Sequence, residues 1–294
     1  MCIYYANNSK LDYIYSNTYN YNVSCLLEER YFMNQEAIYK ANNSLSMVLN
    51  DYYDYFKLKP MNTMVTLTND IGDLYKNKRP ELFKKGLINL DYANSTRGTM
   101  IPPKILGEDF TIAIDINYFF NSTTKNDWQW AGTLTHEMTH VYDYSNYVKM
   151  NRLDNYDMVQ YEFIHRPFVL WSEFHAKAIG DLFIRKYTYG DRLEDENDYD
   201  QIDNILDIEF PNKKEMVLKS LNGNSDDDFY AIMHFMGSYS VWEKLFPNVF
   251  NEEFRKITFE GNDMLLNLYD FLLNHQTLEE ANKDFDKMMK LITE

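Results

Sequence analysis

The sequence predicts an α+β protein in which a small mixed β-sheet lobe with an edge strand precedes a largely helical C-terminal lobe. Short strand-like runs lie between residues 64 and 117, and long helical spacings follow from residue 126. Hydrophobic residues make up 45% of the chain and aromatic residues 16%, which favours a packed core over disorder. With 294 residues, the chain is long enough to bury a sizeable core in one large domain or in two joined lobes.

The first half of the chain predicts one helical region and three strands. The spacing of apolar residues is helical in the range 24–57. Strands are expected at residues 64–68, 87–92 and 110–117. The last strand is the best defined, because alternate isoleucines place one apolar face along it.

Helices are expected after this strand. Asn126 and Gln129 resemble a capping box, so one long helix is expected over residues 126–147. Pro167 suits the first turn of a second long helix, which is expected to end near residue 185. Two further helix starts are predicted by the same capping pattern, at Ser225 with Asp228 and at Thr277 with Glu280.

These elements suggest how the chain is divided. We expect residues 1–60 to form a helical N-terminal segment and residues 61–294 to form one large domain. Within that domain, the sheet lobe is expected at about 61–147 and the helical lobe at about 148–294. The acidic run at 191–200 is expected to be a solvated loop, since it lacks the glycine and the final glutamate of a calcium-binding loop.

Charge and cysteine content narrow the class of partner and compartment. The net charge of -16 argues against nucleic acid, which requires clustered lysine and arginine. Only two cysteines are present, so no disulfide framework is implied. No signal peptide is visible, and no apolar stretch approaches the ~18 residues of a membrane span. We therefore expect a cytoplasmic protein with neither nucleic acid nor a membrane as a partner.

An HExxH motif occupies residues 136–140. Residues four apart lie ~40° apart around a helix, so His136 and His140 share one face. Two imidazoles at this spacing are typical ligands of zinc (Zn2+). Glu137 is placed to act as the catalytic base, taking a proton from the water that zinc activates.

The alternative is that both histidines are ordinary residues of a helix surface. The remainder of the helix argues against this alternative. Its apolar residues fall within ~80° of one another, on the side opposite the histidines. Gly132 and Thr133 on the histidine side are small and would leave room for a ligand and a substrate. The apolar stripe consists of Trp130, Leu134, Met138 and Val141.

A catalytic zinc site requires a third protein ligand. The metzincin pattern would place glycine and histidine where the chain has Asp143 and Asn146, so that class is excluded. A cysteine ligand of the deformylase kind is possible only at Cys25, which has no supporting context. Glu173 is the better candidate, because small residues beside it would allow its helix to approach another closely. An ordinary solvated glutamate is the alternative there.

The segments HEMTHVYDY and Ser-Glu-Phe-His-Ala resemble the gluzincins, and in particular the ImmA/IrrE-like peptidases and the catalytic domains of the anthrax lethal factor family. The resemblance covers residues 85–188. It implies a zincin-like fold, Glu173 as the third zinc ligand, and binding of extended substrate by the strand at 110–117. Lethal-factor-like enzymes usually carry a tyrosine seven residues before the ligand glutamate. This chain has Arg166 there, with Tyr161 and His165 nearby.

The residue that stabilises the developing oxyanion is therefore left open. Two catalytic candidates lie on the helix expected near 225–245: either His234 or Tyr239 could polarise the scissile carbonyl. A structural role is the alternative for His234. Asp143 is a candidate partner for a ligand histidine. His175 projects ~160° away from Glu173 around its helix and is not expected to reach the metal.

The sequence thus predicts a zinc-dependent endopeptidase that acts on a protein or peptide substrate. A non-catalytic zincin-fold protein with a regulatory or toxin-like binding function is the rival. Glu137 favours the enzyme, because a binding scaffold does not need a base. A purely structural zinc site is disfavoured, since such sites are usually closed cages of four cysteine and histidine ligands.

Overall fold

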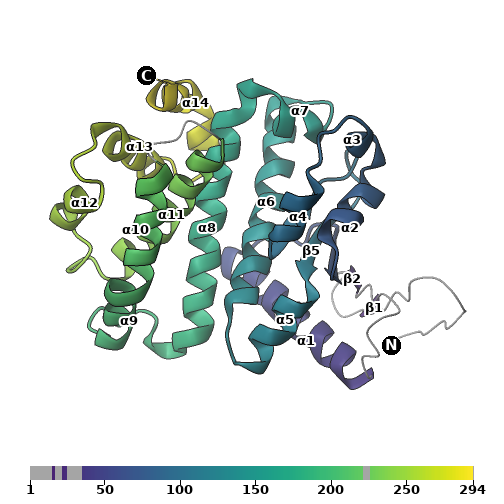
Figure 1. Cartoon of the computed structure of the whole chain (residues 1–294), viewed down its shortest axis with the longest axis horizontal. Helices are drawn as coiled ribbons and strands as arrows, with labels where there is room; N and C mark the ends of the chain where they lie inside the picture. Colours follow the sequence, from purple (N-terminus) through teal and green to yellow (C-terminus); the bar gives the residue numbers. More distant parts are fainter. Residues whose placement is uncertain (1–14, 17–21, 25–34, 221–225, 294) are drawn as a thin grey trace, which may run out of the picture. The chain divides into compact units, whose positions relative to one another are not determined.

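The computed structural model describes residues 15–16, 22–24, 35–220 and 226–293 (Figure 1). The chain divides into two compact units. The described residues up to Val148, together with Arg152–Tyr156, form the first unit, and the described residues of Lys149–Asn151 and from Asp157 onward form the second. All described strands lie in the first unit, and most of the remaining described structure is helical. The α+β class that the sequence predicts is therefore confirmed.

The strands form one mixed sheet in the order β1-β2-β3-β5-β4. Strand β3 runs parallel to both β2 and β5, whereas β4 pairs antiparallel with β5. Residues on both faces of β5 are buried, as expected for a strand in the interior of a sheet. The strands are β1 (Tyr15–Ser16), β2 (Asn22–Ser24), β3 (Thr63–Thr68), β4 (Gly98–Ile101) and β5 (Phe110–Asp115).

Two of the three expected strands are confirmed, as β3 and β5. The prediction of a strand at 87–92 is wrong. The side chain of Asn89 accepts a hydrogen bond from the backbone N–H of Tyr92 and caps a short helix, α4 (Leu90–Ser95). Strand β5 also ends earlier than expected, because the side chain of Asp115 caps the next helix, α5 (Ile116–Thr124).

The strand that was expected to bind extended substrate does not lie at an edge of the sheet. Strand β5 is paired on both sides, with β3 and β4, so the segment at 110–117 has no free edge for a peptide. Among the described strands, β4 ends the sheet on this side. Sequence patterning did not predict β4.

The longest described helix that begins in the first unit carries the HExxH motif. This helix, α6, begins at Gln129, whose N–H donates to the side chain of Asp127. Asn126 adopts a positive φ of 53° instead of capping the helix, so the expected capping box is wrong. The helix expected over 24–57 is confirmed from Gln35 to Phe56, whereas Ser24 ends strand β2. Cys25 lies outside the described residues. The helices are α1 (Gln35–Phe56), α2 (Ile71–Lys78), α3 (Pro80–Lys84), α4, α5 and α6 (Gln129–Asn151).

In the second unit, α8 (Arg166–Tyr189) and α11 (Asp226–Leu245) lie side by side (Figure 1). Pro167 lies in the first turn of α8, as expected. Thr277 and Glu280 form reciprocal hydrogen bonds at the start of the last helix, which confirms that cap, whereas Ser225 lies outside the described residues. The other elements are α7 (Tyr156–Tyr161), a 3-10 turn at Phe163–His165, another at Gly190–Arg192, α9 (Tyr199–Asn204), a π-helical turn at Ile205–Glu209, α10 (Phe210–Ser220), α12 (Glu252–Thr258), α13 (Asp263–Asn274) and α14 (Leu278–Thr293).

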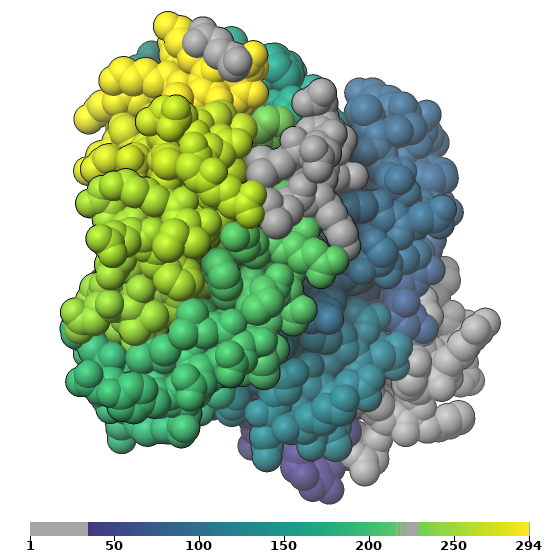
Figure 2. All heavy atoms as spheres, turned by 60° about the vertical axis from the view of Figure 1, so that its left-hand side comes forward, coloured from purple at the N-terminus to yellow at the C-terminus, as the bar shows by residue number. Residues whose placement is uncertain are grey.

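The core of the second unit is rich in aromatic side chains. Trp242, Phe246, Phe250 and Tyr269 are among its fully buried residues. Figure 2 shows the side chains of the C-terminal helices, yellow-green to yellow, closely packed on the visible face of this unit. Within the described ranges, no helix combines the length and apolar character needed to cross a bilayer.

Candidate metal centre

Helix α6 has the two sides that its sequence predicts. Trp130 is 1% exposed, and Leu134, Met138 and Val141 are fully buried in the core. On the other side, His140 is buried and His136 is half-buried. The apolar stripe fixes the rotation of the helix and thereby determines where the two imidazoles point.

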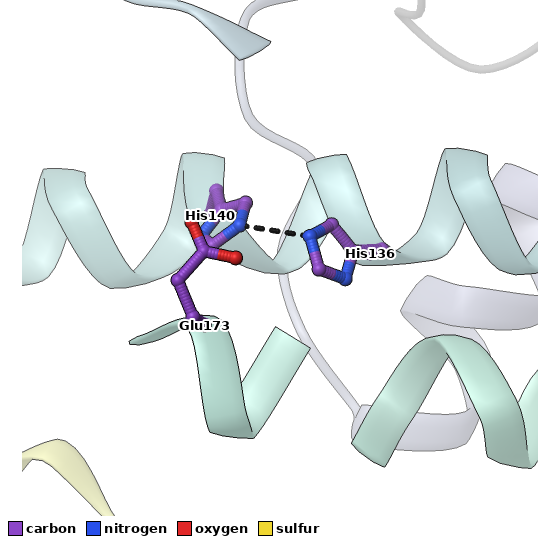
Figure 3. A group of neighbouring side chains, drawn as sticks. All are labelled: His136, His140 and Glu173. Atoms are coloured by element: carbon purple, nitrogen blue, oxygen red, sulfur yellow. Dashed lines mark hydrogen bonds between the residues drawn. The ribbon is translucent and has the colours of Figure 1, made fainter. Parts of the chain in front are cut away.

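The two histidines point at the same place. Their Nε2 atoms lie 3.0 Å apart (Figure 3). Two imidazole nitrogens at this separation either share one N–H hydrogen or share a cation. Zinc–nitrogen bonds of ~2.0–2.1 Å in a tetrahedral site place two ligand nitrogens ~3.3 Å apart. The spacing therefore suits a shared metal ion with little movement of either ring.

Glu173 joins this pair. One ligand atom from each of His136, His140 and Glu173 lies within 4.8 Å of the other two (Figure 3). Among the described residues, this is the one such group of three or more histidine, cysteine or acidic side chains. Two imidazoles and one carboxylate can hold a metal ion, and this donor set leaves a fourth position for water or substrate in a catalytic zinc site.

Strand β4 lies directly against α6 beside Glu137. A Cβ atom added to Gly98 would lie 2.5 Å from Cγ2 of Thr133 and 3.7 Å from Cγ of Glu137. Thr133 also hydrogen-bonds the hydroxyl of Tyr118, at 3.1 Å. The small side chain of Thr133 was expected to leave room for substrate, but this space is taken by the backbone of β4. Glu137 itself is 8% exposed.

A tyrosine of α1 anchors α6 between the two histidines, a contact that sequence patterning did not predict. The hydroxyl of Tyr52 lies 3.2 Å from that of Thr139. Thr139 donates its own hydrogen to the carbonyl of Thr135, so Tyr52 is the donor in this pair. Burial raises the pKa of Tyr52 well above its usual value, and nearby Asp143 raises it further. Asp143 is buried, and its role as a partner of a ligand histidine stays a prediction.

Within the second unit, Glu173 has a polar partner on the neighbouring helix. Nε2 of His234 lies 2.9 Å from Oε2 of Glu173. The side chain of Glu173 is 19% exposed and that of His234 is 43% exposed. His234 was expected to face a substrate carbonyl or to be structural. In the structure it contacts the carboxylate of a candidate ligand.

The expectation that Tyr239 polarises a carbonyl is not met. Tyr239 is 0% exposed and lies in the aromatic core, with its ring centroid 5.5 Å from that of Tyr269 and 5.8 Å from that of Phe259. Burial also raises the pKa of its hydroxyl. A phenol enclosed in this way does not contact a substrate.

The other candidates near the site have local partners. Arg166 stacks its guanidinium 5.2 Å from the ring centroid of Phe229. His165 is buried, and this burial lowers its pKa. His175 stacks on Trp171 at a centroid distance of 4.9 Å and is not part of the metal-ligand group, as expected.

Comparisons with protein-family models, with curated proteins and with solved structures found no match for this chain. The assignment of function therefore depends on the site itself.

Proposed function

We propose that the protein is a zinc-dependent endopeptidase of the gluzincin type with a zincin-like fold. The supporting observation is the convergence of ligand atoms from His136, His140 and Glu173 within 4.8 Å. Glu173 is 33 positions beyond the motif, so its presence in this group is not a consequence of helix geometry around residues 136–140. A donor set of two imidazoles and one carboxylate is that of the His2Glu catalytic zinc sites.

The roles of the residues follow from this arrangement. Zinc, when bound, supplies a Lewis acid that lowers the pKa of water toward ~7 and polarises a carbonyl. Glu137 follows His136 directly in α6 and accepts a proton from the attacking water, then returns it to the leaving amine. The two histidines and Glu173 would hold the ion.

Strand β4 is the proposed site for the substrate backbone. It ends the described sheet on this side, and its Gly98 lies beside Glu137. A peptide that adds to a sheet edge is held by main-chain hydrogen bonds. Such binding places the scissile bond near the base without requiring a particular side-chain sequence.

Metal removal tests this function. Cleavage of a peptide library should stop when the protein is stripped with 1,10-phenanthroline and return when about one equivalent of Zn2+ is added. Mg2+ should not restore cleavage, since it prefers an all-oxygen octahedral set. Undiminished cleavage by the stripped protein would refute the proposal. Tight zinc binding without cleavage of any peptide would favour the non-catalytic binding protein.

A further inference from the structure

Helices α8 and α11 approach each other closely at Gly237. A Cβ atom added to this glycine would lie 2.6 Å from the carbonyl oxygen of Phe174 and 3.0 Å from the backbone nitrogen of Ala178. Backbone atoms of a helix cannot move aside as the end of a flexible side chain can. The absence of a side chain at position 237 is therefore what permits this helix separation.

This approach places His234 against Glu173. His234 lies one turn before Gly237 on α11, and Glu173 directly precedes Phe174 on α8. The two side chains meet with Nε2 of His234 2.9 Å from Oε2 of Glu173. A carboxylate can only accept, so Nε2 carries the hydrogen whether the imidazole is neutral or charged.

His234 is not itself a member of the ligand group. One ligand atom from each of His136, His140 and Glu173 lies within 4.8 Å of the other two, and His234 does not join this group. Its contact is with the glutamate. A hydrogen bond to one carboxylate oxygen restricts rotation of the carboxylate and so orients it for a cation.

We propose, on the basis of the zinc site proposed above, that His234 is a positioning residue that orients Glu173 for metal binding. Gly237 sets the helix separation that this hydrogen bond requires. The role differs from polarisation of a substrate carbonyl, because it predicts an effect on zinc affinity in the absence of any substrate.

A matched pair of amide substitutions tests the hydrogen bond. Gln carries its N–H group at about the position of histidine Nε2, whereas the shorter Asn carries it near Nδ1. In the full chain, zinc affinity would be measured by competition with a chromogenic chelator, with metal-free thermal melts as the folding check. His234→Asn should weaken zinc binding by about 10–100-fold, the usual effect of losing such a partner. His234→Gln should retain most of the affinity. His175→Gln, on the helix of Glu173 but outside the ligand group, is the control and should match wild type.

Two results would overturn the positioning role. The first is zinc affinity of His234→Asn equal to that of wild type, including the case in which only kcat falls. The second is equal loss in the Asn and Gln variants, because the hydrogen bond would then not be the cause. If wild type itself bound no zinc, the proposed function would fail together with this role. Tight binding by both wild type and His234→Asn would refute the positioning role alone.

Discussion

The Nε2 atoms of His136 and His140 lie 3.0 Å apart across one turn of α6. This spacing is close to the ~3.3 Å that tetrahedral zinc requires of two nitrogen ligands. The buried stripe on the opposite side of α6 and the hydrogen bond from Tyr52 to Thr139 hold the helix in place. The two imidazoles are therefore held at a separation that one metal ion could span.

Removal of a ligand should reduce zinc affinity more than removal of an orienting residue does. We expect His140→Ala and Glu173→Ala each to weaken zinc binding by more than the ~10–100-fold that is typical when a ligand loses its hydrogen-bond partner. Metal analysis of the purified variants, together with competition against a chelator, measures this. His175→Ala is the control on the same helix as Glu173. Full zinc retention by Glu173→Ala would point to a different third ligand.

The contact between β4 and α6 should tolerate no side chain at position 98. In Gly98→Ala, the new methyl group would lie 2.5 Å from Cγ2 of Thr133. Overpacking of this kind costs about 1–3 kcal/mol of unfolding free energy, measurable by urea denaturation. Thr133→Ser removes Cγ2 but keeps the hydroxyl that bonds Tyr118. The double variant should therefore recover much of the loss. Wild-type stability in Gly98→Ala alone would contradict this packing.

A buried carboxylate links three helices of the second unit. Asp181 on α8 accepts hydrogen bonds from Lys177 at 2.6 Å and from Lys213 on α10 at 2.9 Å, and Lys213 also donates to Ser238 on α11. The lysine side chains remain 25% and 26% exposed, so solvent screens part of the attraction. We expect Asp181→Asn to lower the unfolding free energy by roughly 1–3 kcal/mol. A calorimetric melt of Asp181→Asn that superimposes on that of wild type would rule out a stabilising role.

The same carboxylate predicts a dependence on pH. Burial alone would raise the pKa of Asp181, but Lys177 and Lys213 outweigh it and hold the pKa well below its usual value. A group with a depressed folded pKa stabilises the fold above its unfolded pKa of ~3.9 and loses that contribution as pH falls through the folded value. The stability difference between wild type and Asp181→Asn should therefore be constant from about pH 5 to 7 and shrink below about pH 4. If the stability difference instead grew as the pH fell, the depressed pKa of Asp181 would be contradicted.

The parts of the fold that the sequence predicts are those with a local signal. In helix α6, the apolar residues recur with the helical period. In β5, isoleucines occupy alternate positions. Strand β4 lacks such a pattern, because its four residues become a strand only through pairing with β5. The error at 87–92 has a local cause: apolar residues suggested a strand, but Asn89 caps a helix.

The candidate site shows the same division. The spacing of His136 and His140 and the small residues around Glu173 are visible in the sequence, and the structure brings these three side chains together. The contact of His234 with Glu173 requires two helices to meet at Gly237, which no single segment reveals. Tyr239 was misassigned because tyrosine suits both a polar site and an apolar core. In the folded chain its side chain is fully buried in the core.

Glu137 is the proposed base of a zinc peptidase. Paired metal analysis and peptide-library cleavage of wild type and Glu137→Gln test it most directly. We expect both proteins to hold one zinc ion per chain and only wild type to cleave, because Gln keeps the shape of Glu137 but cannot accept the proton. Cleavage at the wild-type rate by Glu137→Gln, or the absence of zinc from wild type, would contradict this role of Glu137.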